Sequence, residues 1–267
     1  MYARVHRLRG VNPAADELER ALSFMATVDE AAASTVREWS LGTALITPEL
    51  PKVWDSSYFR VERDGGDGER AAAETARLAG DAGLAHAAVV LTAEAYASRM
   101  RPGLAAAGFE ESRFVLMALR EVPAEPGIPV EAASFADVAP SRRALTLEIF
   151  DGDKDLADQL GELDRRLEAT IGGRWFAIRE DDEITSRAWL LGREGVGQVE
   201  DVATSTEQRG RGLARAVVSA AARASHQMGN ELTFVIADDG RTTPELYRKT
   251  GFEPIGHKWR FVKKLDA

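Results

Sequence analysis

A glycine-rich turn between an expected strand and an expected helix constrains this chain more than any other feature of its sequence. Residues 208–214 form the turn, after an apolar run at residues 196–203 that is typical of a strand. Beyond the turn, apolar residues recur at the spacing of one helix face as far as Met228. The first N–H groups of a helix lack internal partners and lie at the positive end of its dipole, so they attract phosphate oxygens. Because Gly210 and Gly212 have no Cβ, a pyrophosphate has room to approach the main chain.

Other glycine-rich phosphate sites fit this turn poorly. No Gly-Lys-Ser or Gly-Lys-Thr follows it, which excludes a P-loop, and Arg215 stands where a dinucleotide-binding fingerprint has its third glycine. Two glycines before a helix are also compatible with an ordinary tight connection that binds nothing, and this alternative stays open.

A second motif lies downstream of the turn, after an expected strand at residues 232–237. It reads Pro-Glu-Leu-Tyr-Arg-Lys-Thr-Gly-Phe at residues 244–252. This motif resembles the Leu-Tyr-x-Lys-x-Gly-Phe helix and turn of the GNAT superfamily of N-acetyltransferases, and residues 209–214 fit that family's Arg/Gln-x-x-Gly-x-Gly/Ala acetyl-CoA signature. The resemblance covers roughly the last half of the chain and implies acetyl-CoA as co-substrate. The residues that it places at the cofactor are Val202, Ala203, Gln208, Arg209, Gly210, Arg211, Gly212, Leu213, Ala214 and Thr243.

The two halves of the chain repeat one order of elements on either side of a proline-rich stretch at residues 121–129. The second half runs from the helix after the turn through a strand, a short helix and a Gly-Phe turn to a closing strand. In the first half the same order runs from an alanine-rich helix at residues 69–78 to a closing strand at residues 114–119. We therefore predict a mixed α/β (α+β) fold of tandem GNAT-like domains, each with a mixed, mostly antiparallel sheet flanked by helices. The expected domains are residues 1–125 and 126–267.

The first half departs from the family pattern where the chemistry would lie. Residues 64–69, Asp-Gly-Gly-Asp-Gly-Glu, stand in place of the phosphate turn, and their carboxylates would repel phosphates. Leu104 stands at the position that Tyr247 holds in the second half. We expect this half to be catalytically degenerate, and either to buttress the other half or to wall its acceptor site. Near its start, Asn12 followed by Pro13 predicts the beginning of a helix.

Acetyl transfer from a thioester to an amine needs a neutral nucleophile, a polarised carbonyl and a proton for the departing thiolate. An alkyl amine with a pKa of about 10.4 is mostly protonated at neutral pH, so a base must take its proton. Glu200 and Asp201 lie on the strand before the turn, where the family often places a base or a water relay, and strand alternation points them to opposite faces. We take Glu200 as the candidate base. Which of the two faces the acceptor stays open, as does the alternative that both are solvated or salt-bridged carboxylates.

Tyr247 is the candidate acid, because its phenol stays protonated at neutral pH and the resemblance places it near the thiolate sulfur. A core tyrosine on an amphipathic helix is the alternative. The resemblance also implies that a backbone N–H near Val202 or Ala203 polarises the carbonyl. The family's common Asn ahead of the tyrosine helix is missing here, and Thr243 either supplies a hydroxyl to the cofactor or caps the helix before Pro244.

The acceptor site is less well marked. Residues 151–155, Asp-Gly-Asp-Lys-Asp, lie where the family usually lines its acceptor site, and their carboxylates could attract an ammonium group. The alternative is that Asp153 caps the following helix and that the other carboxylates face water.

Composition excludes several other functions. The formal net charge of −9 argues against a broad nucleic-acid surface. The chain has no cysteine, which excludes disulfides and thiolate nucleophiles, and its four histidines lack partners at metal-ligand spacing, so we expect no metal site. No apolar run reaches the roughly 20 residues that cross a bilayer, and we expect a cytoplasmic protein without a membrane partner.

The leading hypothesis is an acetyl-CoA-dependent N-acetyltransferase. It would transfer the acetyl group to a primary amine of a small molecule, a peptide or a protein by direct attack in a ternary complex. We expect acetyl-CoA and an amine acceptor as partners, and a monomer or a homodimer. Two other hypotheses stay open: a non-catalytic acyl-CoA-binding or sensor protein that lacks a positioned base, and a tandem structural module whose turn binds nothing.

Overall fold

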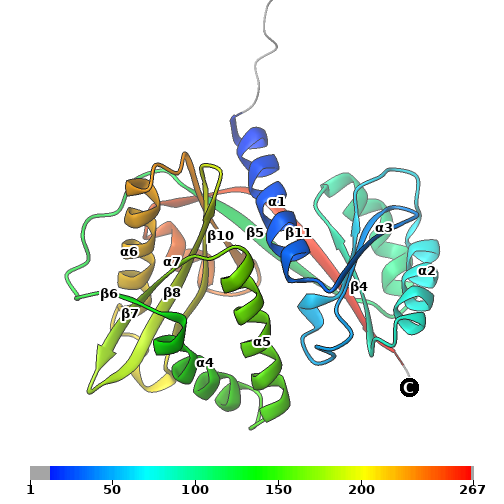
Figure 1. The fold of residues 1–267 in the computed structure, drawn as a ribbon. Coiled ribbons are helices and arrows are strands. Elements are labelled where there is room, and N and C mark those ends of the chain that lie inside the picture. The colour runs from blue at the N-terminus through cyan, green and yellow to red at the C-terminus, as the bar shows by residue number, and fades with distance from the viewer. Residues whose placement is uncertain (1–12, 266–267) are drawn as a thin grey trace, which may run out of the picture.

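One sheet of eleven strands runs through the computed structural model, which describes residues 13–265 (Figure 1). The strand order is β1-β2-β3-β4-β11-β5-β10-β9-β8-β7-β6. The strands are β1 (Thr35–Trp39), β2 (Gly42–Ile46), β3 (Tyr58–Val61), β4 (His86–Leu91), β5 (Glu110–Leu119), β6 (Glu131–Ala133), β7 (Arg174–Glu180), β8 (Glu183–Arg193), β9 (Val196–Thr204), β10 (Leu232–Asp238) and β11 (Phe252–Lys264). The α-helices are α1 (Pro13–Ala32), α2 (Gly68–Asp81), α3 (Glu94–Ala106), α4 (Phe135–Ile149), α5 (Lys154–Thr170), α6 (Leu213–Gln227) and α7 (Thr243–Arg248).

The two halves of the sheet are built in the same order of elements, as the sequence predicts. The first half runs β3-α2-β4-α3-β5 and the second runs β9-α6-β10-α7-β11. In each half the two strands that flank the first of these helices are parallel. The other strand pairs are antiparallel, which confirms the predicted mixed α/β fold of two similar, mostly antiparallel halves.

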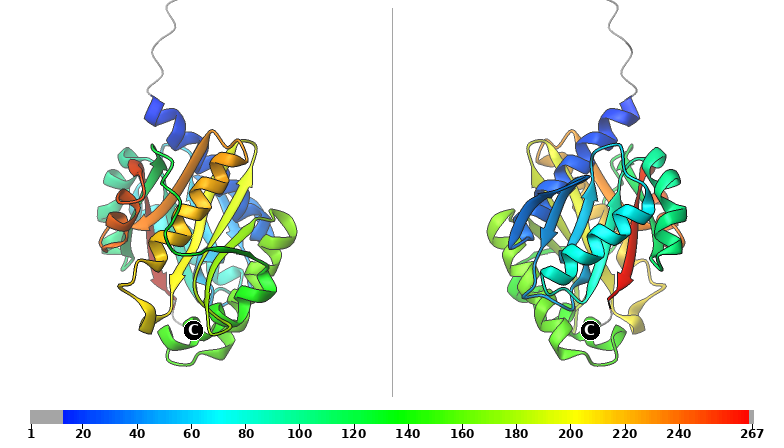
Figure 2. Two further views of the ribbon diagram at one scale, coloured as in Figure 1. Left: turned by 90° about the vertical axis from the view of Figure 1, so that its left-hand side faces the viewer. Right: turned by 90° about the vertical axis from the view of Figure 1, so that its right-hand side faces the viewer.

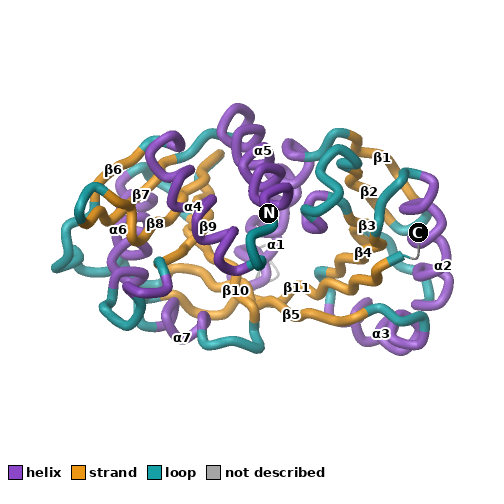
Figure 3. The backbone as a smooth tube through the Cα atoms, turned by 90° about the horizontal axis from the view of Figure 1, so that it is seen from below, coloured by secondary structure: helices purple, strands orange, loops and turns teal. Residues whose placement is uncertain are grey.

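The closing strand of each half lies in the other half of the sheet. β5, from the first half, pairs antiparallel with β10 of the second half. β11, which closes the second half, pairs antiparallel with β4 of the first half. β5 and β11 also pair with each other and run between the two halves in Figure 3. The sequence predicts both strands but not their exchange, and the division of the chain at residue 125 stays a prediction.

Helices cover the second half of the sheet on both faces (Figure 2). On one face, Val217 of α6 packs in a cluster with Val235 of β10 and with α7. On the other face, Phe24 of α1 and Val138 of α4 share a cluster with Phe234 of β10. α1 precedes the first half in the chain, yet it packs on strands of the second half. It therefore adds to the connection that the exchanged strands make between the halves.

Local sequence signals fix where the helices begin. α1 begins at Pro13 as predicted, whereas Asn12, the predicted cap, lies outside the described residues. The hydroxyl of Ser134 accepts the backbone N–H of Asp137, and the Asp137 carboxylate accepts the backbone N–H of Ser134, which makes a capping box at the start of α4. Asp153 caps α5 by accepting a backbone N–H of the first turn. The first cap fixes the start of α4, and the second fixes the point where the acidic connection after α4 leads into α5.

We expect residues 1–125 alone not to fold cooperatively. Both neighbours of β5 come from the second half, and Leu116 and Met117 at the centre of β5 are 0% exposed in the whole chain. Thermal unfolding followed by circular dichroism should show no cooperative transition for this fragment, and one should return when residues 126–267 are added. A sharp transition of the isolated fragment near the midpoint of the whole chain would contradict this expectation.

Candidate active site

The parallel strands β9 and β10 part before either of them ends. Their pairing stops at Val199 beside Val235. β9 continues to Thr204 beside β8 alone, and β10 continues to Asp238 beside β5 alone. The edge of β9 beyond residue 199 therefore presents N–H and C=O groups that no neighbouring strand takes up.

A bulge in β9 lies where the two strands part. Glu200 pairs with Trp189 and Ala203 pairs with Arg187, so two residues of β9 oppose a single residue of β8. Asp201, within the bulge, has a φ of 45°. This is the left-handed region, which is costly for most residues other than glycine and which Asp adopts more readily than most.

An open cleft of about 670 Å³ lies against this part of β9. It is bounded by the end of β9, the glycine turn, the start of α7 and the last turns of α4, where Leu145 and Ile149 reach it. No sequence motif marks the two α4 residues. Every predicted cofactor residue except Arg211 lines the cleft, namely Val202, Ala203, Gln208, Arg209, Gly210, Gly212, Leu213, Ala214 and Thr243.

The glycine turn depends on backbone conformation. Gly210 and Gly212 have φ values of 79° and 82°, and a Cβ at either position would meet no atom within 4 Å. Glycine is therefore favoured at both positions because the backbone is left-handed there. α6 begins at Leu213 without a side-chain cap, and Leu213 and Ala214 line the cleft. The first N–H groups of α6 are thus available to an anion in the cleft.

Positive charge around the turn is distributed unevenly. The Arg211 guanidinium donates two hydrogen bonds, of 2.8 and 2.9 Å, to the carboxylate of Glu180 and another to the Gln208 side chain, and Arg211 itself does not line the cleft. The side chain of Arg211 therefore does not lie at the position beside the cofactor that the sequence predicts. Arg209 and Arg215 line the cleft and have no ion-pair partner among residues 13–265. An anionic group in the cleft would meet these two guanidinium groups together with the positive end of the α6 dipole.

Tyr247 of α7 lines the cleft and is 5% exposed. Its ring packs edge to face on Phe252, with 6.0 Å between the ring centroids, so core packing holds its orientation. Burial, and in second place the negative charge of Glu200, raise the pKa of the Tyr247 phenol above its ordinary value. The hydroxyl therefore stays protonated at neutral pH and can act as a proton donor.

Glu200 is half-buried at the point where β9 leaves β10. Burial raises the pKa of its carboxyl to about 7, although a hydrogen bond from the Gln198 amide and the charge of Lys258 act in the opposite direction. A carboxylate with a pKa near 7 is a far better base at neutral pH than an ordinary glutamate, because the best catalytic pKa lies close to the working pH.

Glu200 and Asp201 lie on the same face of the sheet, contrary to the prediction from strand alternation. Glu200 is the partner of Trp189, whose indole packs in the cluster under α1 and α4. The Asp201 carboxylate accepts a hydrogen bond of 2.7 Å from Arg187 of β8 and one of 3.1 Å from Arg142 of α4, on the same side. The bulge adds a residue to β9 and so breaks the alternation. Asp201 is held by two arginines, whereas Glu200 accepts a hydrogen bond from a neutral amide, so Glu200 is the better candidate for a base.

The acidic loop between α4 and α5 is engaged within the chain. Asp153, besides capping α5, accepts hydrogen bonds of 2.7 and 2.9 Å from the Lys52 ammonium. The carboxylate of Asp155 lies 3.3 Å from the same ammonium group. This geometry agrees with the alternative that Asp153 caps a helix, and it joins the loop to the first half of the chain.

A second cavity, of about 570 Å³, lies between α4 and the β7–β8 hairpin. It shares Leu145 with the cleft and is lined by Ser141 and Arg187. No periodicity or motif in the sequence indicates this cavity, because its walls come from elements that meet only in the folded chain.

A clustered set of metal ligands and a membrane-spanning helix are both absent from the described part of the chain. Residues 13–265 contain no group of three or more His, Asp and Glu side chains arranged to hold a metal ion. None of the helices within this range has the length and apolar character needed to span a bilayer.

Part of the second half is similar to a known protein family. Residues 177–261 match the family described as FR47-like protein. This range runs from β7 to β11 and so contains the bulge, the glycine turn and Tyr247. No curated protein matches the chain significantly.

Solved structures match nearly the whole chain. A functionally unknown conserved protein from Staphylococcus epidermidis has a TM-score of 0.68 at 12% identity, over 88% of this chain and 95% of its own. A GCN5-related N-acetyltransferase from Kribbella flavida has a TM-score of 0.62 at 20% identity, over 97% and 98%. A tandem GNAT protein from the clavulanic acid biosynthesis pathway has a TM-score of 0.57 at 12% identity, over 95% and 96%. The chain therefore has the tandem GNAT fold, and residues 177–261 in its second half are similar to the FR47-like family.

Proposed function

We propose that this protein is an acetyl-CoA-dependent N-acetyltransferase that transfers the acetyl group to a primary amine in a ternary complex. One observation carries the proposal. Where β9 and β10 part, the gap has Glu200, with a pKa of about 7, on one face of the sheet and Tyr247 on the other. The GNAT fold supports acetyl transfer in general, and this arrangement supplies a base and an acid for it.

The cofactor fits the cleft from the glycine turn inward. The pyrophosphate binds the N–H groups at the start of α6, next to Gly210 and Gly212, where Arg209 and Arg215 add positive charge. The pantetheine arm enters the gap between β9 and β10 and takes up the unpaired edge of β9. The acetyl carbonyl then accepts a hydrogen bond from a backbone N–H near Val202 or Ala203, which stabilises the developing oxyanion.

In the proposed reaction, Glu200 acts on one face of the gap between β9 and β10, and Tyr247 acts on the other face. The amine approaches on the face of Glu200, which takes a proton from the nitrogen as the C–N bond forms. The C–S bond then breaks toward the other face, where the Tyr247 hydroxyl donates a proton to the departing thiolate. The proton gained by Glu200 equals the proton lost by Tyr247, so exchange with solvent restores both groups.

The first half is proposed to be non-catalytic. Its parallel strands stay paired to the end of β3, with Val61 beside Leu91, so it has no gap that matches the one beside β9. A Cβ at Gly68 would collide with the backbone of Met100, because α3 lies directly against the start of α2. Asp67 caps α2 with its carboxylate and so occupies the position where a phosphate would bind. These three features agree with a degenerate copy.

Tyr247→Phe should lower turnover ten-fold or more while leaving acetyl-CoA affinity almost unchanged. The substitution removes only the hydroxyl that donates to the thiolate, and the ring keeps its packing on Phe252. Steady-state kinetics together with calorimetric titration of acetyl-CoA measure the two effects separately. Unchanged turnover would remove Tyr247 from the mechanism.

The pH dependence should report Glu200. The ratio kcat/KM should rise through about pH 7 as the carboxyl loses its proton, and Glu200→Gln should abolish this rise. Lys258→Met should move the midpoint upward by about half a unit or more, because the Lys258 charge lowers the pKa of Glu200. An arylamine acceptor keeps the substrate neutral across this range, so that only the enzyme titrates. A midpoint that moves downward, or a rise that survives in Glu200→Gln, would contradict the assignment.

An amine panel with detection of released CoA thiol tests the proposed function directly. We expect thiol release with at least one primary amine, and its loss in Glu200→Gln.

Gly212→Glu should lower acetyl-CoA affinity at least ten-fold, because a carboxylate and a strained backbone replace a site for phosphates. Gly80→Glu, on α2 where a Cβ meets no atom within 4 Å, is the matched control. Tight acetyl-CoA binding without transfer to any amine would favour an acyl-CoA sensor, and equal affinity of parent and Gly212→Glu would favour a structural module.

A further inference from the structure

The left-handed residue Asp201 is held by a cluster of buried charges that reaches α5. Arg142 of α4 binds Asp201 at 3.1 Å and also donates two hydrogen bonds to Asp164 of α5, one of them 2.8 Å long. Arg187 binds the other oxygen of Asp201 at 2.7 Å. The side chains of Asp164 and Arg187 are each 4% exposed. Two arginines face two carboxylates, so removal of any one of them leaves a buried charge without its partner.

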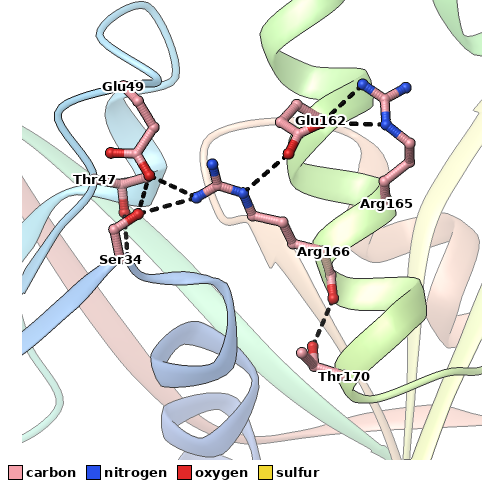
Figure 4. Close-up of polar contacts among 7 residues, drawn as sticks. All are labelled: Ser34, Thr47, Glu49, Glu162, Arg165, Arg166 and Thr170. Carbon is pink, nitrogen blue, oxygen red and sulfur yellow. Dashed lines mark hydrogen bonds and ion pairs between the residues drawn. The ribbon is translucent and has the colours of Figure 1, made fainter.

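The opposite side of α5 is bound to the first half of the chain. Near the start of α5, Lys52 binds Asp153, and its backbone N–H donates a hydrogen bond of 2.8 Å to the Gln159 side chain. Near the other end, Arg166 donates to Glu49 at 2.9 Å (Figure 4). The loop at residues 47–52, between β2 and β3, thus holds α5 at two points along its length.

Figure 4 shows how the second of these points is assembled. Arg166 extends from α5 toward the first half, where it reaches Glu49 and, at 3.1 Å, the hydroxyl of Ser34. Its Nε is 3.3 Å from Glu162 of the same helix, which restrains the guanidinium. Arg166 lies two residues after Asp164, and such residues project to different sides of a helix. α5 is therefore bound by the first half on one side and by Arg142 on the other.

We propose that the first half of the chain positions the catalytic strand β9 through α5, by way of the contacts from residues 47–52 to α5 and from Asp164 through Arg142 to Asp201. The proposal rests on the proposed function. It makes Lys52 and Arg166 positioning residues that touch neither substrate. In this proposal the first half, which lacks a cofactor cleft, holds the bulge beside Glu200 in place.

Small displacements of β9 have large consequences for the reaction. The bulge sets both the direction of Glu200 and the position of the backbone N–H groups near Val202. A shift of about 1 Å in a reacting group can cost on the order of 100-fold in rate. Exposed ion pairs such as the one between Lys52 and Asp153 add little stability singly, so their removal should leave the fold intact. Their expected effect is therefore on the geometry of β9.

The test begins with the double variant Lys52→Met/Arg166→Met in the full chain. We expect kcat to fall about ten-fold, while acetyl-CoA Kd stays within two-fold of the parent. The conservative variant Lys52→Arg/Arg166→Lys should restore kcat, because it keeps both charges. Arg77→Met, which breaks an exposed ion pair within α2, is the matched control and should change neither quantity.

A double-mutant cycle with Asp201→Asn tests whether Lys52 and Arg166 influence kcat through Asp201. Asparagine tolerates a left-handed backbone, so this variant keeps the bulge accessible while removing the charge that the arginines bind. If the contacts act through Asp201, adding Lys52→Met/Arg166→Met to Asp201→Asn should lower kcat by less than two-fold further. Independent, multiplying effects would overturn the proposed route.

Amide hydrogen exchange separates this proposal from the proposed function. In Lys52→Met/Arg166→Met, exchange at residues 200–204 should quicken at least ten-fold, while exchange in α6 stays as in the parent. This measurement needs no turnover, so it decides the proposal even if the protein transfers no acetyl group. Unchanged exchange at residues 200–204, or unchanged kcat in an active enzyme, would overturn it.

Discussion

The site depends on backbone hydrogen bonds that β9 and β10 do not make with each other. The residues of β9 beyond Val199 are half-buried beside the open cleft, so water or a ligand can take up the peptide groups that β10 leaves unpaired. The strands part at the bulge around Asp201, where β9 has one extra residue. The same extra residue brings Glu200 and Asp201 to one face. A ligand that takes up the free edge of β9 would have the Glu200 carboxyl on that face and the Tyr247 phenol on the other.

The exchange of β5 and β11 makes the first half of the chain part of the structure that surrounds the cleft. β5 comes from the first half and continues the second half of the sheet beside β10. α1 covers the same sheet, and α5 is bound by the loop between β2 and β3. The second half thus takes a strand, a helix and two polar contacts from its partner half. In the partner half, β3 and β4 stay paired and Asp67 caps α2, so the same framework there binds no phosphate in our account.

Much of this structure was predictable because it is encoded by local signals. Gly210 and Gly212 have the positive φ values that a phosphate turn before a helix uses, and the helix periodicity beyond them is regular. Tyr247 sits in a motif of fixed spacing, and it lines the same cleft as the turn. The order of elements in each half follows from periodicity and turn residues, which is why the tandem fold could be predicted.

The parts that could not be predicted depend on contacts between distant residues. Strand alternation predicts opposite faces for Glu200 and Asp201. In the structure, arginines from α4 and β8 bind Asp201 at a bulge, and the sequence of β9 contains no pattern that predicts this bulge. Arg211 belongs to the cofactor motif, yet Glu180 on the β7–β8 hairpin binds its side chain instead. The exchange of β5 and β11 has no sequence signal, because the alternation of side chains along a strand does not tell which strands pair with it.

A structure of the protein with bound acetyl-CoA tests the central claim most directly. The account predicts the pyrophosphate at the N–H groups that begin α6, the pantetheine arm in the gap where β9 leaves β10, and the sulfur within hydrogen-bonding distance of the Tyr247 hydroxyl. The thioester carbonyl should accept a backbone N–H near Val202 or Ala203. A cofactor bound elsewhere, or a gap closed by pairing of β9 with β10 beyond Val199, would contradict the account.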